Sequence, residues 1–126
     1  MNSKILIIED EADLLEMEKH RLELGHYEVI TATDGVEGLY KARIGKPDLI
    51  VLDVLLPHLD GYSLLRELKQ DPAMSAIPVI VLTTRDQLRN LFEMEGISSE
   101  NYLIKPFDGK KLVNRIETLL AQSEDV

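Results

Sequence analysis

The chain contains no cysteine, which removes several chemistries from consideration. Without thiols it has no disulfide bond, no cysteine nucleophile and no cysteine-ligated zinc site. Long apolar runs are absent as well, because no stretch reaches the ~18 residues that a membrane-spanning helix needs. The first residues, MNSKILIIEDEAD, turn acidic too early for the apolar core of a signal peptide. These absences favour a cytoplasmic domain that does not bind membranes.

Basic residues are scarce relative to acidic ones. The chain has 14 lysines and arginines against 23 aspartates and glutamates, which gives a formal net charge of −9. Nucleic-acid affinity depends largely on basic side chains that contact phosphates, so we expect no direct nucleic-acid binding by this domain. The acidic balance is compatible with binding a divalent cation, although a solubilising surface explains the charge more simply.

Several catalytic signatures are also missing. There is no glycine-rich dinucleotide or nucleoside triphosphate motif, and no serine or cysteine elbow of the hydrolase type. His20, His26 and His58 lack the spacing of metal ligands, so we interpret them as surface residues. Three methionines are interpreted as packing residues: Met17, Met74 and Met94.

What the sequence does contain is a regular alternation of short apolar runs and helical patterns. Strands are predicted at residues 4–8, 27–32, 49–52, 79–82 and 102–104, and helices at 11–24, 36–45, 62–69, 88–96 and 112–120. Because the strands are continuously apolar, both of their faces are expected to be covered. Strands that alternate with helices form parallel sheets with right-handed crossovers. The 126 residues therefore predict one α/β domain with a doubly wound parallel sheet.

Polar side chains follow four of the five predicted strands. Glu9 and Asp10 come after the first strand, Asp53 ends the third, Thr83 ends the fourth and Lys105 follows the fifth. Open parallel sheets bind ligands beyond the carboxyl ends of their strands, so these side chains are expected to meet at one edge. Two carboxylates ~4 Å apart repel by about 4 kcal/mol at an effective dielectric constant of ~20, and a shared cation would relieve this repulsion.

Mg²⁺ suits such a site because it prefers hard oxygen ligands and keeps several waters. A lysine ammonium group and a threonine hydroxyl can both contact a phosphoryl oxygen. The set of a carboxylate nucleophile, a metal, a cation and a hydroxyl donor fits phosphoryl transfer onto an aspartate.

Each of these residues also has a simpler interpretation when taken alone. Asp53 could be a polar residue that reaches the surface at a strand end, and Asp10 could cap the first helix. Lys105 could be a solvated side chain, and Thr83 is a common strand residue. Only the combination of all four favours a phosphoryl-transfer site.

Four motifs occur in order along the chain: ILIIEDE, LIVLDVLLPHLDG, PVIVLTT and YLIKPF. With these motifs the sequence resembles the receiver domain of two-component response regulators, including the chemotaxis regulators, over residues 4–120. The resemblance implies one receiver domain over residues 1–126. It also implies a flavodoxin-like fold with five helices and strand order 2-1-3-4-5.

The resemblance also implies a role for each site residue. Asp53 matches the phosphate-accepting aspartate, and Mg²⁺, with Mn²⁺ as an alternative, is the implied cofactor. The implied metal ligands are Asp10, Asp53, the backbone carbonyl of Leu55 and, through water, Glu9. Lys105 matches the lysine that contacts the phosphoryl group, in a Lys105–Pro106 peptide expected to be cis. Thr83 and Tyr102 match the two switch residues.

In this family, a sensor histidine kinase or a phosphotransfer protein donates the phosphoryl group. The domain then catalyses only its own phosphorylation and hydrolysis, so it is not expected to be an enzyme for outside substrates. Phosphorylation is expected to change the face formed by helix four, strand five and helix five. That face would control a protein effector, an output domain on the C-terminal side, or a phosphorylation-dependent homodimer.

Some positions depart from the family pattern. Lys111 stands where DNA-binding relatives that pair through this face often carry glutamate, although Arg115 is retained. Leu55 cannot help to position a water molecule, so slow self-hydrolysis of the phosphorylated form is expected. The acidic tail, AQSEDV, favours a free-standing receiver over a fragment of a longer regulator.

Two alternative functions remain open. A Mg²⁺-dependent aspartyl phosphohydrolase would commonly carry a second acid two residues after Asp53, where this chain has Leu55. A receiver-like scaffold that binds partners without phosphorylation would not need the complete set of site residues.

Overall fold

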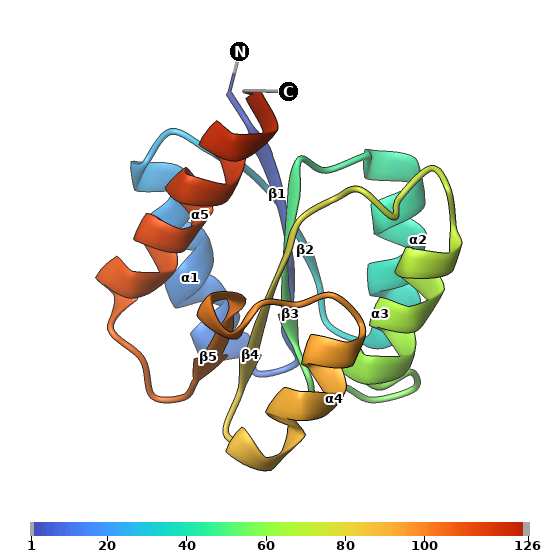
Figure 1. The fold of residues 1–126 in the computed structure, drawn as a ribbon. Helices are drawn as coiled ribbons and strands as arrows, with labels where there is room; N and C mark the ends of the chain where they lie inside the picture. Colours follow the sequence, from blue (N-terminus) through green and yellow to red (C-terminus); the bar gives the residue numbers. More distant parts are fainter. Residues whose placement is uncertain (1, 125–126) are drawn as a thin grey trace.

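The computed structural model describes residues 2–124 and contains a five-stranded parallel sheet between two layers of helices (Figure 1). The strand order is β2-β1-β3-β4-β5, and the four strand pairs are parallel. This confirms the predicted flavodoxin-like fold and strand order. The strands are β1 (Lys4–Ile8), β2 (Glu28–Ala32), β3 (Leu49–Asp53), β4 (Val79–Thr83) and β5 (Tyr102–Ile104). The helices are α1 (Ala12–Leu24), α2 (Gly35–Gly45), α3 (Gly61–Gln70), α4 (Arg89–Met94) and α5 (Gly109–Glu124).

Both faces of the sheet are covered, as the continuously apolar strands predicted. Helices α1 and α5 lie on one side of the sheet, and α2 and α3 lie on the other (Figure 1). Successive strand side chains point to opposite faces. In β1, Ile5 and Ile7 therefore belong to the core under α1 and α5, whereas Leu6 and Ile8 belong to the core under α2 and α3. Burial on both faces explains why the interiors of β1, β3 and β4 are continuously apolar.

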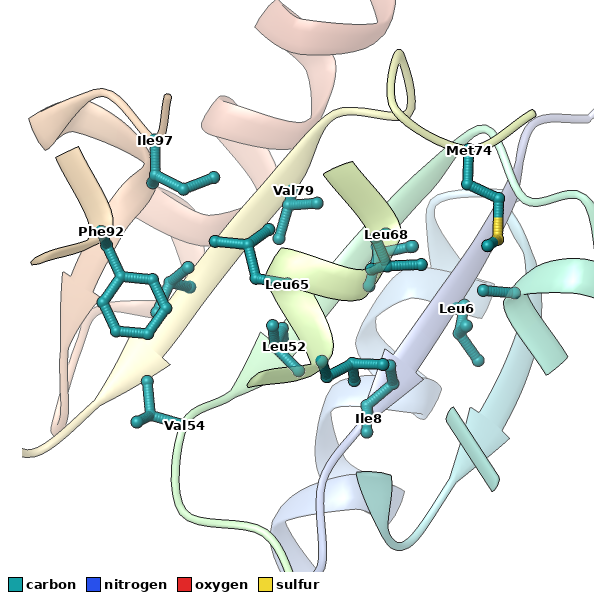
Figure 2. Packing of buried hydrophobic residues seen from close by; sticks show 14 of the residues in the cluster. Leu6, Ile8, Leu52, Val54, Leu65, Leu68, Met74, Val79, Phe92 and Ile97 are labelled. Carbon is teal, nitrogen blue, oxygen red and sulfur yellow. The ribbon is translucent and has the colours of Figure 1, made fainter. Parts of the chain in front are cut away.

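The core on the α2 and α3 side is drawn in Figure 2. Three leucines of α3 are buried in this core: Leu64, Leu65 and Leu68. Figure 2 shows Leu65 and Leu68 above strand residues such as Leu52, with Phe92 of α4 and Met74 toward opposite ends of the layer. Fixing each strand between two apolar layers holds the strand ends in place, and the polar residues lie at those ends.

Some predictions about individual residues were wrong. Met74 is buried as expected, but Met17 and Met94 are largely exposed. In α1 the buried line consists of Leu15, Glu18 and Leu22, which places Met17 on the outer side of the helix. The predicted fourth helix is also shorter, because a 3-10 turn precedes α4 and α4 has only six residues. Met94 is the last of these six, and Phe92 occupies the interior instead.

Gly61 fixes the path of the chain beyond β3. A Cβ atom at Gly61 would lie 2.6 Å from the backbone oxygen of Asp53 and 2.7 Å from Cα of Val54. The Gly61 N–H also donates to the Val54 carbonyl at 2.9 Å. Only glycine allows α3 to begin this close to the end of β3, and the residues between Val54 and Asp60 therefore form a tight loop beside Asp53.

None of the helices formed by residues 2–124 combines the length and the apolar character that crossing a membrane requires.

Candidate functional site

Three carboxylates meet at the carboxyl edge of the sheet. Glu9 and Asp10 follow β1, and Asp53 ends β3. Oxygen atoms from the three side chains lie within 4.8 Å of one another. The register explains the meeting, because Ile8 of β1 pairs with Leu52 of β3 and the next residue of each strand is an acid. The expectation that acids distant in sequence become neighbours is confirmed, and we call Glu9, Asp10 and Asp53 the acid cluster.

Two members of the acid cluster are almost inaccessible to solvent. The exposed fraction is 1% for Glu9 and 5% for Asp53, whereas Asp10 is exposed. Burial raises the pKa of Glu9, and the neighbouring Asp53 carboxyl raises it further. The acid cluster therefore concentrates negative charge where water screens it poorly, and it needs a cation.

Lys105 supplies a positive charge to the acid cluster. Its Nζ lies 2.8 Å from Oε1 of Glu9 and 3.3 Å from Oδ2 of Asp53. Burial lowers the pKa of Lys105, but the hydrogen bond to Glu9 and the charge of Asp53 outweigh burial, so its pKa is raised. Its backbone N–H donates to the Thr83 carbonyl at 2.7 Å, and the Lys105–Pro106 peptide is cis as expected.

The acid cluster fits a magnesium ion by the chemistry of its donors. The three carboxylates provide hard oxygen atoms, and the exposed Asp10 leaves one side open to water, which Mg²⁺ usually keeps as ligands. The Lys105 ammonium group already bridges Glu9 and Asp53, which shows that these two carboxylates can share a cation. The alternative role of Asp10 as a helix cap is not observed, because α1 begins after Glu11 with no side-chain cap.

The loop after β3 contacts Asp53 through its backbone. The N–H of Leu55 donates to Oδ1 of Asp53 at 3.2 Å, and the Leu55 side chain is half exposed. This contact places the Leu55 backbone beside the acid cluster. Its carbonyl as a metal ligand remains a prediction.

Thr83 and Tyr102 are joined through the backbone of Arg85. The hydroxyl of Thr83, which is buried, accepts a hydrogen bond from the Arg85 N–H at 3.1 Å. The hydroxyl of Tyr102 donates to the Arg85 carbonyl. The Tyr102 ring is buried, lies 5.6 Å from the Phe92 ring and has the Arg89 guanidinium 4.8 Å from its centre. A change at Thr83 can therefore reach Tyr102 through one residue.

Glu18 was not recognised from the sequence. It lies on the inner side of α1 with an exposed fraction of 2%, and within residues 2–124 neither of its carboxylate oxygens has a hydrogen-bond partner. Burial, followed by the charge of Glu9, raises the pKa of Glu18 to about 7. The spacing of Leu15, Glu18 and Leu22 could have placed it inside. Residues 18–21 form a polar run in the sequence, which conceals the inward position of Glu18.

A cavity of about 340 Å³ opens beside Lys105, between α1 and the segment after β5. Its apolar wall includes Leu14, Met17, Pro106 and Phe107. Lys105 lines this cavity and also contacts the acid cluster, whose own three residues do not line it.

The chain is similar to known proteins along its whole length. The alkaline phosphatase synthesis transcriptional regulatory protein PhoP of Bacillus subtilis (strain 168) is 40% identical over 124 residues, which are 98% of this chain and 51% of that protein. The receiver domain of Francisella response regulator 1452 has 31% identity and a TM-score of 0.87, covering 97% of this chain and 99% of that chain. The receiver domain of sensor histidine kinase PA1611 from Pseudomonas aeruginosa PAO1, solved with a magnesium ion in its active site cleft, has 28% identity and a TM-score of 0.86, covering 96% and 99% of the two chains.

The chain spans about half the length of the curated relatives it matches. Residues 5–117 match the family model of the response regulator receiver domain. The fold, the order of the motifs and the acid cluster agree with this match. The chain therefore belongs to the response regulator receiver domain family.

Proposed function

We propose that residues 1–126 form one receiver domain that works as a phosphorylation-controlled switch, with Asp53 accepting a phosphoryl group from a phosphohistidine. The donor would be a sensor histidine kinase or a phosphotransfer protein. The observation that supports this most is the geometry at Asp53, whose carboxylate shares one site with two further acids and with Lys105.

In the transfer step, a carboxylate oxygen of Asp53 attacks the phosphorus atom. The new P–O bond forms as the P–N bond to the donor histidine breaks, and the electron pair of that bond stays on the imidazole nitrogen. Lys105, whose Nζ lies 3.3 Å from Asp53, would contact a phosphoryl oxygen. Asp10, Asp53, the Leu55 carbonyl and, through water, Glu9 would hold Mg²⁺, or Mn²⁺ in its place. The metal would supply charge neutralisation for the transferring group.

The switch would begin at Thr83. In the structure its hydroxyl accepts from the Arg85 N–H, and in the phosphorylated state the hydroxyl would donate to a phosphoryl oxygen instead. Because Arg85 also binds the hydroxyl of Tyr102, the rearrangement would shift the population of conformations on the face formed by α4, β5 and α5. The Tyr102 ring already lies inward in this structure and packs against Phe92. The population shift would therefore start from an inward position of this ring.

The partners follow from the same proposal. Receiver domains are signalling proteins and not enzymes for outside substrates, and the PhoP relative is a transcriptional regulatory protein about twice as long. The face of α4, β5 and α5 would act on a protein effector, on an output domain or on a second phosphorylated copy. A kinase-linked switch of this kind would operate in the cytoplasm. The cavity is lined by Lys105, whose Nζ lies 3.3 Å from Asp53, and it would offer the donor protein a surface near the site.

The proposed function can be tested by incubating the protein with Mg²⁺ and a small acyl phosphate and measuring its intact mass. We expect each chain to gain the mass of one phosphoryl group, and omitting Mg²⁺ should prevent this. Turnover of many donor molecules per chain without a stable adduct would indicate a phosphohydrolase. No adduct and no turnover would indicate a scaffold that works without phosphorylation.

Replacing Lys105 with methionine is expected to destabilise the domain at neutral pH by about 3 kcal/mol, because two buried carboxylates lose their cation. The loss should shrink at acidic pH, where Glu9, whose pKa is raised, becomes neutral. Added Mg²⁺ should restore much of the free energy of unfolding, since it binds the folded state. Urea unfolding with and without Mg²⁺ measures both effects.

The matched control is Lys105→Arg, which keeps a positive charge near Glu9 and Asp53. It should be destabilised less than Lys105→Met at neutral pH. If Mg²⁺ stabilised Lys105→Met no more than the unchanged protein, the acid cluster would not be a shared cation site.

A further inference from the structure

Helix α2 carries a row of apolar side chains on its outer side. Val36, Tyr40 and Ile44 have exposed fractions of 58%, 60% and 62%. They are spaced four residues apart and therefore lie along one side of the helix. The opposite side, with Gly38 and Ala42, is buried against the sheet. In Figure 1 α2 lies on the right-hand side of the molecule, beside α3.

The charge along α2 changes sign near its middle. Asp34 and Glu37 are at the N-terminal half, and Lys41, Arg43 and Lys46 are at the C-terminal half. Glu37 and Lys41 form an ion pair at 3.1 Å on one flank of the apolar row. A surface that is acidic at one end and basic at the other is complementary to a reversed copy of itself.

We propose that α2 is a self-association surface, on which two copies of this chain pack their α2 helices antiparallel about a two-fold axis. The apolar rows then face each other, with Tyr40 close to the axis. On the flank, Glu37 of each copy approaches Lys41 of the other, so four charges of alternating sign surround the axis. Antiparallel helices also bring opposite ends of the two helix dipoles together.

A second copy fits this surface better than a partner of uniform charge. A uniformly acidic partner such as nucleic acid would face Asp34 and Glu37, and a uniformly basic one would face Lys41 and Arg43. Three apolar side chains per copy form a small contact, so we expect a weak dimer with a dissociation constant in the micromolar to millimolar range. The pairing needs no phosphoryl group and does not depend on the proposed function of Asp53.

The test exchanges charges on the flank. Glu37→Lys makes the flank of each copy basic and Lys41→Glu makes it acidic, so each variant should self-associate at least about tenfold more weakly than the unchanged protein. An equimolar mixture of the two should associate about as tightly as the unchanged protein. The double variant Glu37→Lys with Lys41→Glu should regain self-association. Sedimentation equilibrium over a concentration series, with unphosphorylated protein, measures the association of the two single variants, their mixture and the double variant.

Three controls keep the test decisive. Lys41 also donates to the Thr31 carbonyl at 2.6 Å, so each variant is checked for an unchanged unfolding curve. Tyr40→Ser, which alters only an exposed side chain, should weaken association without affecting that curve. Arg115→Glu on α5 should leave association unchanged. A protein that stays monomeric at millimolar concentration, a charge mixture that associates no better than its components, or a dimer lost only in Arg115→Glu would each overturn the proposal.

Discussion

Replacing Asp53 with asparagine is expected to abolish covalent phosphorylation while leaving the domain folded. The amide has nearly the shape of the carboxylate, and its oxygen can still accept the Leu55 N–H that Asp53 accepts at 3.2 Å. It cannot form the acyl phosphate, because it has no anionic oxygen to attack phosphorus. The intact mass after incubation with Mg²⁺ and a small acyl phosphate should show no adduct.

Asp60→Asn is the matched control for this experiment. Asp60 lies in the same loop and caps α3 by accepting the Ser63 N–H at 2.9 Å, a role that asparagine fills equally well. Asp60→Asn should therefore become phosphorylated like the unchanged protein. A phosphoryl adduct on Asp53→Asn, or loss of the adduct only in Asp60→Asn, would contradict the assignment of Asp53.

Asp53→Asn should also change the acid cluster itself. Removing the Asp53 charge takes away one of the causes that raise the pKa of Glu9, so Glu9 should ionise at lower pH. The remaining carboxylates should bind Mg²⁺ at least about tenfold more weakly. The Asp53→Asn variant would thus lose metal affinity without leaving Lys105 unpaired, because Lys105 keeps Glu9 as a partner at 2.8 Å.

The sequence predicted the features that depend on strand periodicity and strand ends. Continuously apolar strands implied a sheet covered on both faces, and a parallel sheet brings Glu9, Asp10 and Asp53 to one edge. These inferences need only the topology and no side-chain detail. The structure agrees because the register of β1 with β3 places the two strand ends side by side.

The features that were missed depend on which side of a helix a residue occupies. In α1 the hydrophobic Met17 stands next to Glu18, so hydrophobicity alone predicts that Met17 points inward and Glu18 outward. The structure has the reverse arrangement. Helix α4 is short and has no side-chain cap, so its limits carry little signal in the sequence. The link between Thr83 and Tyr102 runs through backbone atoms of Arg85, which any residue type could provide.

The buried carboxyl group of Glu18 should make the domain less stable as the pH rises. Its pKa is about 7 in the folded protein, against an ordinary value of 4.5. Between pH 4.5 and a pH of about 7, Glu18 keeps its proton in the folded protein but has released it in the unfolded chain. The free energy of unfolding therefore falls as pH rises through this window, and above pH ~7 the full cost of about 3 kcal/mol is present.

Glu18→Gln removes this titration while keeping the shape of the side chain. Its free energy of unfolding, compared with that of the unchanged protein, should be similar near pH 4.5 and higher by roughly 2–3 kcal/mol near pH 8. Urea unfolding at a series of pH values measures the difference between the two curves. Glu16→Gln is the control, because Glu16 is exposed on the same helix and its replacement makes the same chemical change away from the buried site.

Mg²⁺ should reduce the advantage of Glu18→Gln. The charges of Glu9 and Asp53 help to raise the pKa of Glu18, so a cation held by those two carboxylates should lower that pKa and make ionised Glu18 less costly. By linkage, the unchanged protein should bind Mg²⁺ more tightly than Glu18→Gln at pH 8, and equally well at pH 5. A stability difference between the two proteins that stayed constant from pH 4.5 to pH 8 would show that Glu18 does not titrate near neutrality.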